Sequence, residues 1–272
     1  MNDLTRRLIE SWLPSRTLRS KLAVELCREQ GELLALEALP LTRQGGELLA
    51  RLKVLGLTVI PCWELPQACR RLRKPPLCLF VRGSPEPLKG PALGIVGARS
   101  AAPDALRWSE SVAMSAAEQG LCVVSGGARG VDSAAHEGAL AATGKTVAVL
   151  GVGAGRIYPA GHRDLFRRIL CAGGALVTEY TPGEITYATD QVARNRLIAA
   201  LSVGLVVAEA GARSGSLHTA RASIRLGREI VVSPCGLRGA RAGLEALIRA
   251  GADGRGNWVR AVSPIVNYAQ QV

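Results

Sequence analysis

From residue 93 onward, short apolar runs alternate with longer segments whose apolar residues recur at helical spacing. The runs are rich in valine and isoleucine and almost continuously apolar, which is typical of strands buried on both faces. Strands that alternate with helices in this way predict an α/β fold with a doubly wound, mostly parallel sheet. The predicted strands are 93–98, 121–125, 145–151, 175–179, 204–209 and 229–234, and the predicted helices are 103–119, 131–142, 162–172, 190–202, 216–226 and 242–250.

The first 90 residues follow a different pattern. Residues 1–56 have helical periodicity interrupted by proline and paired glycines, and two short apolar runs at 57–61 and 77–83 predict strands. A segment rich in proline and glycine, 85–91, predicts a linker. The predicted domains are therefore a helical N-terminal region at 1–56, two strands and a linker at 57–90, the α/β domain at 91–255 and a C-terminal tail at 256–272.

The chain is strongly basic. Its 272 residues carry a formal net charge of +12, and 48% of them are hydrophobic, which is ample for a core. A large positive charge indicates a polyanionic partner, nucleic acid before membrane. The segment ACRRLRKPP (residues 68–76) has four basic residues within a run of five, and it fits a solvated helix face and a DNA contact equally well.

The cysteines and the N-terminus indicate the compartment. None of the seven cysteines lies in a CxxC or Cys/His cluster with metal-binding spacing, so we expect free, buried thiols, as at Cys122 and Cys171, and no metal. The N-terminus has no apolar stretch of a signal peptide, and no apolar run approaches 18 residues. These features predict a cytoplasmic protein without a membrane partner.

Candidate binding residues lie directly after the predicted strands, at the edge of a parallel sheet where ligands bind. The strand 121–125 turns through SGGARG (residues 125–130) into a helix that begins at Val131. Such a turn directs backbone N–H groups and the helix dipole at one spot, which suits a phosphate, and Arg129 lies within it. The alternative is a tight turn whose arginine merely faces solvent.

Catalytic and cofactor patterns are weak. The first strand of the α/β region continues as Gly97-Ala98-Arg99-Ser100, without the glycine pattern of a dinucleotide site, which argues against a nicotinamide enzyme. Asp132 and His136 are four residues apart on one helix, an arrangement that is more often structural than catalytic. Glu179 and Glu209 both end strands, so a carboxylate pair stays open as an interpretation.

Two later helices carry unusual basic residues. In 190–202, Asp190 fits an N-cap, Arg194 aligns with the apolar stripe and Arg196 projects from roughly the opposite side. Two arginines that bracket Asn195 at a helix start favour a functional role over a structural one. In 216–226, His218, Arg221 and Arg225 share a face that fits either a nucleic-acid backbone or solvent.

These segments together resemble the DprA/Smf family of DNA-processing proteins, from about residue 52 to residue 252. The blocks ARGVD, ARNRLIA and SGSL are highly specific in combination. The matching blocks, in chain order, are GARS (97–100), SGGARGVDSAAHEGAL (125–140), GKTVAVLGVGAGRIYP (144–159), ARNRLIAALS (193–202), VVAEAGARSGSLHTA (206–220) and GREIVVSPCG (227–236).

The resemblance implies an extended Rossmann-like domain, a homodimer and sequence-independent binding of single-stranded DNA. It further implies delivery of that DNA to the RecA recombinase and protection of DNA during natural transformation, with no catalysis and no cofactor. The DNA-binding pocket that it implies here comprises Gly97, Arg99, Ser100, Ser125, Gly126, Arg129, Gly130, Asp132, Arg194, Asn195, Arg196, Ser214, Gly215 and Ser216.

The chain departs from the family pattern at several points. Gln191-Val192 replaces the usual Phe-Pro before the ARNR block, His162 replaces an asparagine, and Glu245 stands in the asparagine position of a later block. Residues 1–50 match the family's N-terminal domain poorly, and the chain resembles a short, divergent member without the C-terminal winged helix. The alternative function is that of a related nucleoside-monophosphate phosphoribohydrolase, although that enzyme's Pro-Gly-Gly-x-Gly-Thr-x-x-Glu loop is absent.

Overall fold

The computed structural model describes residues 1–11, 16–28, 41–238, 242–255, 257 and 259. Its centre is one eight-stranded sheet in the order β1-β2-β6-β5-β4-β3-β7-β8. The strands are β1 (Thr58–Pro61), β2 (Cys78–Gly83), β3 (Ala92–Val96), β4 (Cys122–Ser125), β5 (Thr146–Val149), β6 (Ala175–Thr178), β7 (Gly204–Val207) and β8 (Glu229–Val232). The α-helices are α1 (Asp3–Glu10), α2 (Arg16–Arg28), α4 (Arg43–Val54), α5 (Gln67–Arg70), α6 (Pro103–Glu118), α7 (Val131–Ala141), α8 (Arg163–Cys171), α9 (Ala188–Ala193), α10 (Asn195–Leu201), α11 (Ser216–Arg225) and α12 (Ala242–Arg249).

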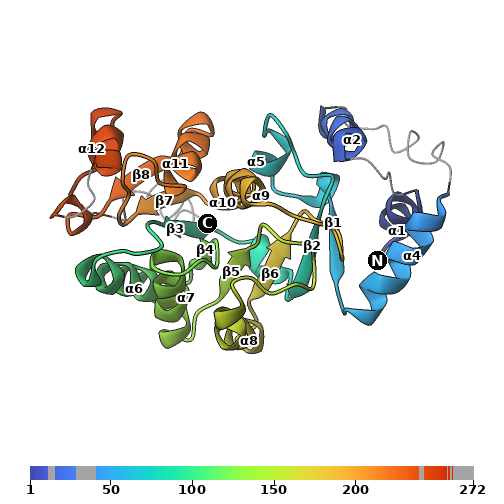
Figure 1. Cartoon of the computed structure of the whole chain (residues 1–272), viewed down its shortest axis with the longest axis horizontal. Coiled ribbons are helices and arrows are strands. Elements are labelled where there is room, and N and C mark those ends of the chain that lie inside the picture. Colours follow the sequence, from blue (N-terminus) through green and yellow to red (C-terminus); the bar gives the residue numbers. More distant parts are fainter. Residues whose placement is uncertain (12–15, 29–40, 239–241, 256, 258, 260–272) are drawn as a thin grey trace, which may run out of the picture.

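The six strands from β3 to β8 are parallel to one another, and helices cover both faces of the sheet (Figure 1). On one face α5, α10, α11 and α12 enclose an apolar core that includes Leu197, Leu217 and Leu244. On the other face α6 and α7 pack around Ile95 and Val123, and Phe166 of α8 belongs to one apolar cluster with Ala148 and Leu176 of the sheet. The predicted doubly wound α/β fold is confirmed. Strand order reverses between β3 and β7, and in sheets of this kind ligands bind beyond the carboxyl ends of the strands at such a point.

The N-terminal part joins this sheet at its β1 edge. The two strands predicted at 57–61 and 77–83 are β1 and β2. They extend the sheet beyond β6, since β2 pairs with β6 and β1 pairs with β2, both in antiparallel orientation. Helices α1, α2 and α4 pack Leu8, Leu22 and Leu52 against Val59 and Phe80. The predicted boundary near residue 90 therefore falls between two strands of one sheet. The stretch 29–39 of the predicted N-terminal helices and most of the predicted tail 256–272 lie outside the described residues.

The predicted helix 190–202 is two helices, α9 and α10, which meet at Arg194. Asp190 is not the N-cap of α9, because Tyr187 occupies that position. Asp190 is the third residue of the helix, and its carboxylate accepts a hydrogen bond of 2.8 Å from the Tyr187 N–H. The seven cysteines are free, as expected, but not all are buried, because Cys171 ends α8 in solvent. Within the described residues, no helix is long and apolar enough to cross a membrane.

Candidate nucleic-acid interface

Three loops meet where the neighbouring strands β4, β3 and β7 end. The loop after β3 is bound to the start of α7 through the Val131 N–H, which donates to the Ala98 carbonyl at 3.2 Å. It is bound to the loop after β7 through the Ala102 N–H, which donates to the Glu209 carboxylate at 2.9 Å. These bonds join the predicted GARS, SGGARG and SGS segments into one surface, which we call the rim.

Glycine is required in the SGGARG turn because the backbone is packed from both sides. At Gly126, an added Cβ would lie 2.4 Å from Nη2 of Arg194 and 2.5 Å from Oδ2 of Asp132. Gly130 has φ of +79°, which L side chains rarely adopt, and its Cβ would lie 2.3 Å from the Ala98 carbonyl oxygen. These two glycines allow close packing between protein segments; their backbones do not face an open space.

Asp132 and Arg194 form the buried floor of the rim. Arg194 is 3% exposed, and its guanidinium donates to the carbonyls of Gly126 at 2.6 Å, of Val149 and of Gln191 at 3.2 Å. Asp132 lies in the first turn of α7, and its carboxylate accepts a hydrogen bond of 3.2 Å from the Ala128 N–H. The positive end of α7 therefore already faces a carboxylate of the protein. Burial raises the pKa of Asp132 against the opposing charge of Arg194 and lowers the pKa of Arg194 to about 10. Both residues therefore shape the turn from within.

The outer layer of the rim is cationic. Arg99 and Arg129 are exposed and form no ion pair within the described part of the chain, and the same holds for Arg213 in the loop after β7. Arg213 was not among the predicted site residues, although it lies in the EAGARSGS segment. We add it to the site because its side chain is exposed in the loop after β7. Three arginines on neighbouring loops supply up to fifteen N–H donors to an anion.

The start of α11 adds polar groups to this surface. Ser214 and Ser216 share a hydrogen bond of 2.7 Å between their hydroxyls, and the first turn of α11 has no acidic residue. Asn195 fixes the position of this turn because its amide donates to the Gly215 carbonyl at 3.0 Å. Unlike α7, α11 therefore begins without a carboxylate at its positive end.

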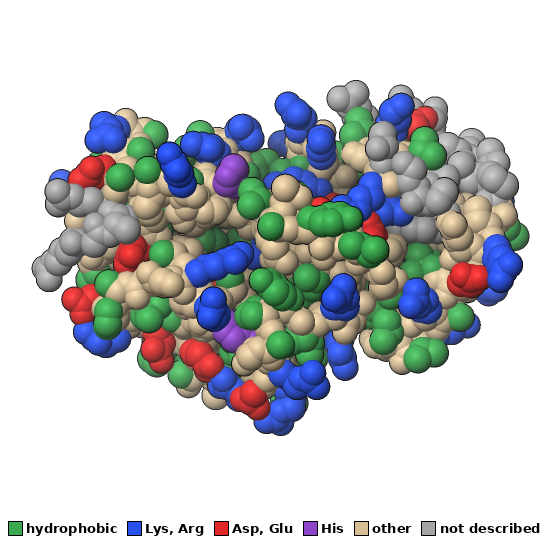
Figure 2. Space-filling model, viewed as in Figure 1, with side chains coloured by type: hydrophobic (Ala, Val, Ile, Leu, Met, Phe, Trp, Pro, Cys, Tyr) green, Lys and Arg blue, Asp and Glu red, His purple; other side chains and the backbone are tan. Residues whose placement is uncertain are grey.

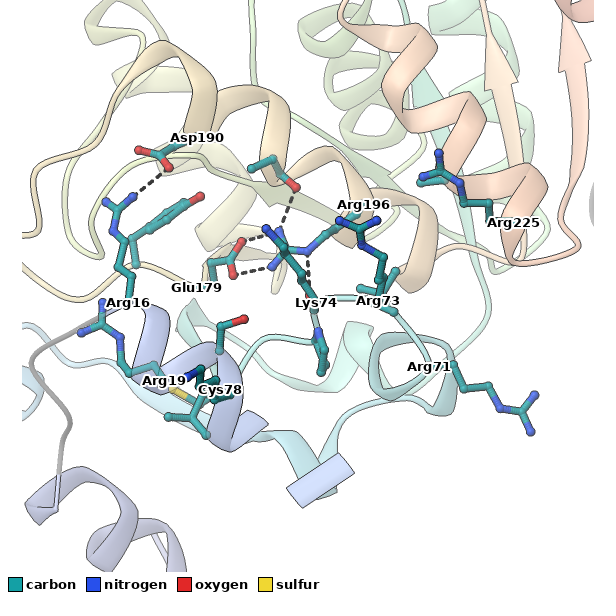
Figure 3. A pocket seen from close by; sticks show the side chains of 18 of the residues that line it. Arg16, Arg19, Arg71, Arg73, Lys74, Cys78, Glu179, Asp190, Arg196 and Arg225 are labelled. Carbon is teal, nitrogen blue, oxygen red and sulfur yellow. Dashed lines mark hydrogen bonds and ion pairs between the residues drawn. The ribbon is translucent and has the colours of Figure 1, made fainter. Parts of the chain in front are cut away.

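Arg196 points away from the rim, into a hollow on the other side of the α9–α10 junction (Figure 3). Its guanidinium binds both carboxylate oxygens of Glu179 at 2.6 Å and donates to the Lys74 carbonyl at 2.9 Å. Burial lowers its pKa, but Glu179 raises it by more, so the net shift of the Arg196 pKa is upward. The assignment of Arg196 to the DNA site remains a prediction, and its charge is already paired.

The structure separates the predicted site residues into layers. Arg99, Ser100, Arg129 and Gly215 are exposed at the rim. Gly97, Gly130, Ser214 and Arg196 are half-buried. The buried members are Ser125, Gly126, Asp132, Arg194, Asn195 and Ser216. Ser125 is fully enclosed, and its hydroxyl donates to the Ile95 carbonyl at 2.6 Å, so it contributes to the strand end and not to the surface.

The possible catalytic sets are not formed. Glu179 follows β6 and Glu209 follows β7, and three strands separate these two, so the carboxylate pair that the sequence left open is not formed. His136 bonds to the Thr146 hydroxyl at 2.7 Å and not to Asp132. Among the described residues, no group of histidine, cysteine, aspartate and glutamate is placed to hold a metal ion.

Two departures from the family pattern support the local structure. The His162 imidazole donates from Nδ1 to the Gly127 carbonyl at 3.0 Å, which secures the SGG turn from the loop before α8. The Gln191 amide donates to the Gly151 carbonyl at 3.2 Å, and Val192 beside it is exposed. His162 thus holds one loop of the rim, and Gln191 joins α9 to the loop after β5.

A doubly wound α/β sheet with its helices on both faces defines a Rossmann-like protein, and cationic loops lie at the switch point of this one. The family model of DNA recombination-mediator protein A matches residues 58–267, and the chain belongs to that family. Protein Smf of Escherichia coli is 40% identical over 159 residues, which cover 58% of this chain and 42% of that protein. The aligned part thus spans less than half of that relative's length.

Two solved structures share the fold. The X-ray structure of DNA processing protein A (DprA) from Streptococcus pneumoniae superposes with a TM-score of 0.73 at 28% identity and covers 97% of this chain and 98% of that one. The superposition therefore includes N-terminal helices that the sequence blocks do not reach. DNA processing protein A from Helicobacter pylori, whose structure concerns a single-stranded DNA binding mode, has a TM-score of 0.68 at 28% identity and covers 78% of this chain and 96% of that one.

Proposed function

We propose that this protein binds single-stranded DNA at the rim without sequence preference. One observation carries the proposal: Arg99, Arg129 and Arg213 are exposed together on loops bonded to one another, and each is unpaired among the described residues. The acidic side chains behind them are buried and occupied, Asp132 by a backbone N–H and Arg194, Glu209 by the Ala102 N–H. Among the described residues of the three rim loops, the exposed charges are therefore cationic and no carboxylate is exposed.

The family relationship supports the choice of single-stranded DNA. The Helicobacter pylori relative binds single-stranded DNA, and it shares this fold over 78% of the chain. Unpaired strands also expose base edges and faces to the serine hydroxyls and backbone groups beside the arginines, whereas a duplex offers only its backbone to three loops. As the family resemblance implies, the proposal includes no catalytic step and no cofactor. Glu209 and Glu179, which the sequence left open as a carboxylate pair, are each held by another group.

Two finer parts of the proposal concern partners. We propose that the protein forms a homodimer and delivers its DNA to the RecA recombinase, in transformation or another recombination pathway, as the family resemblance implies. Delivery is measured as the rate of RecA filament nucleation on single strands already covered by this protein. No acceleration over strands covered by an unrelated single-strand-binding protein would reject it.

Arg129→Ala tests the rim directly. A charge-assisted phosphate contact is worth about 1.5–3 kcal/mol, so the variant should bind single strands about ten- to a hundredfold more weakly. Contact with about four to six phosphates gives a log–log salt slope of roughly −3 to −4, and the loss of one contact should reduce it by about 0.7. Affinity is measured by fluorescence anisotropy at several salt concentrations, with duplex DNA in parallel.

Lys145→Ala is the matched control. Lys145 is exposed just before β5, at the opposite end of the parallel strands, and its removal changes the net charge by the same amount. We expect it to retain parental affinity. The rim is not the binding site if Arg129→Ala melts at the parental temperature and also binds with parental affinity. Tighter binding of duplex than of single strands would reject single-strand preference.

A further inference from the structure

The hollow that Arg196 enters is separate from the rim and lies between α2, the segment after α5, and the helices α10 and α11 (Figure 3). Its volume is about 1110 Å³, which exceeds the usual range of a small-ligand pocket. We call it the basic groove. Its lining includes Arg71, Arg73 and Lys74, from the basic run whose role the sequence left open, and Arg225 from α11.

The acidic residues of the basic groove are all paired. Glu179 holds Arg196 through two hydrogen bonds. Glu184 binds Arg16 at 2.5 Å and Arg19 at 2.9 Å. Burial raises the pKa of Glu184, but the hydrogen bonds from Thr181 and the two arginines together lower it by more, so this pKa lies below the usual value. Asp190 binds Arg16 at 2.9 Å. Each carboxylate is thus neutralised by an arginine of the groove wall.

The remaining cations of the basic groove have no such partner. Within the described residues no ion pair involves the groove's other basic side chains, all of them exposed: Lys21, Arg71, Arg73, Lys74 and Arg225. They come from three separate parts of the chain, α2, residues 71–74 and α11, which surround one space. Figure 2 shows basic side chains along the upper edge of the molecule, over α11 and α5, where acidic side chains are few.

The lining also has an apolar component. Leu72, Pro75 and Leu226 line the basic groove together with the cations. A single nucleic-acid strand carries both charged phosphates and the apolar faces of its bases, and it therefore matches a wall that offers both cations and aliphatic groups. An acidic peptide would match the cations alone. The spread of cations over three elements also favours an extended chain over one compact anion.

We propose that the basic groove binds the phosphodiester backbone of single-stranded nucleic acid as a second contact, beyond the rim. The inference rests on the proposed single-strand binding and extends its path. The two surfaces share the α9–α10 junction, where Arg194 forms the floor of the rim and Arg196, two residues later, lines the groove. A strand that leaves the rim across this junction enters the groove, so a longer oligonucleotide contacts both surfaces.

A triple variant tests the basic groove: Arg73→Gln, Lys74→Gln and Arg225→Gln. The matched control is Lys53→Gln, Arg82→Gln and Lys145→Gln, three exposed cations that line neither surface and form no ion pair among the described residues. For an oligothymidylate of about 24 nucleotides, the groove variant should bind at least tenfold more weakly than the control, with a salt slope smaller by about 2 because three phosphate contacts are lost. Melting temperatures of both variants should match the parent.

A positional measurement accompanies the titration. The same oligothymidylate with 4-thiothymidine near one end should cross-link to peptides that contain residues 71–74 or 222–226. Equal affinities of the groove and control variants, or cross-links confined to the rim loops, would overturn the inference. Displacement of a labelled poly-glutamate probe that depends on the groove, with no change in DNA affinity, would also overturn it and assign the groove to an acidic protein segment.

The outcome is separable from that of the rim. If Arg129→Ala binds like the parent while the groove variant loses affinity, the rim proposal is wrong and the groove stands as the binding site. If Arg129→Ala loses affinity while the groove variant equals its control, the rim stands and the groove inference is wrong. Loss in both variants supports one continuous path.

Discussion

At the scale of single residues, burial separates groups that look equivalent in the motif. Arg129 and Arg194 both belong to recognisable blocks, but Arg129 faces solvent while Arg194 is enclosed and bonded to three carbonyls. The sequence indicates that arginine follows the strand ends; it does not indicate which way each side chain turns. That direction depends on contacts with Gly126 and β5, which are distant in the chain.

His136 provides a residue-scale prediction on stability. Thr146 donates its hydroxyl hydrogen to the Val123 carbonyl, so it must accept from Nδ1–H of His136, and Nε2 of this buried imidazole has no partner. Burial lowers the pKa of His136 from 6.5 to about 3, and the ring is neutral in the folded protein. The unfolded chain takes up this proton more readily than the folded protein does. The neutral imidazole therefore makes its full contribution to the free energy of unfolding above about pH 6.5. This contribution is lost as the pH falls toward 3, by at most about 1.4 kcal/mol per pH unit.

The measurement compares the parent with His136→Gln by denaturant unfolding between pH 7.5 and 4.5. Glutamine donates a hydrogen bond without titrating, so its free energy of unfolding should fall less steeply with decreasing pH. The comparison cancels the contribution of Asp132, whose raised pKa acts in the opposite direction in both proteins. Parallel curves for the two proteins would show that His136 carries no proton-linked stability.

At the scale of elements, the sequence predicted each parallel strand to within a few residues, because four buried apolar residues in succession have few alternatives. It did not predict the partner of β2, since pairing with β6 joins residues nearly 100 positions apart, as Phe80 and Thr178 show. It also missed the break between α9 and α10. Arg194 aligns with the apolar stripe of the predicted helix, so the pattern shows no break there, and only the bonds of that side chain to neighbouring strand ends explain the junction.

Arg194 gives the prediction at this scale. Arg194→Met would leave the buried carbonyls of Gly126 and Val149 without donors and would remove the charge that opposes Asp132. The expected loss is about 2–4 kcal/mol of unfolding free energy, seen as a lower melting temperature. Arg129→Ala is the internal control, because its side chain is exposed and its melt should match the parent. If Arg194→Met melts like the parent, the buried-floor assignment is incorrect.

At the scale of the whole molecule, the rim and the basic groove lie on a chain of high positive charge, and the proposed homodimer would double both surfaces on one particle. Engagement of the second protomer on a long strand then becomes intramolecular, which raises the apparent affinity without new contacts. We expect the dimer face to involve the region of about 227–250. Strand β8 is the outermost strand of the sheet there, and Ile224 at the end of α11 borders the region with its side chain 48% exposed.

Light scattering at tens of micromolar should therefore give about twice the chain mass of 28.6 kDa. Ile224→Glu should shift the protein to monomer, because it places a charge in the proposed contact. It should also weaken binding to long strands at least tenfold while sparing oligonucleotides too short to reach two protomers. Val54→Glu is the control, since Val54 is an exposed apolar residue on α4, far from this edge of the sheet. A parent protein that stays monomeric would reject the dimer, and equal effects of both variants would place the contact elsewhere.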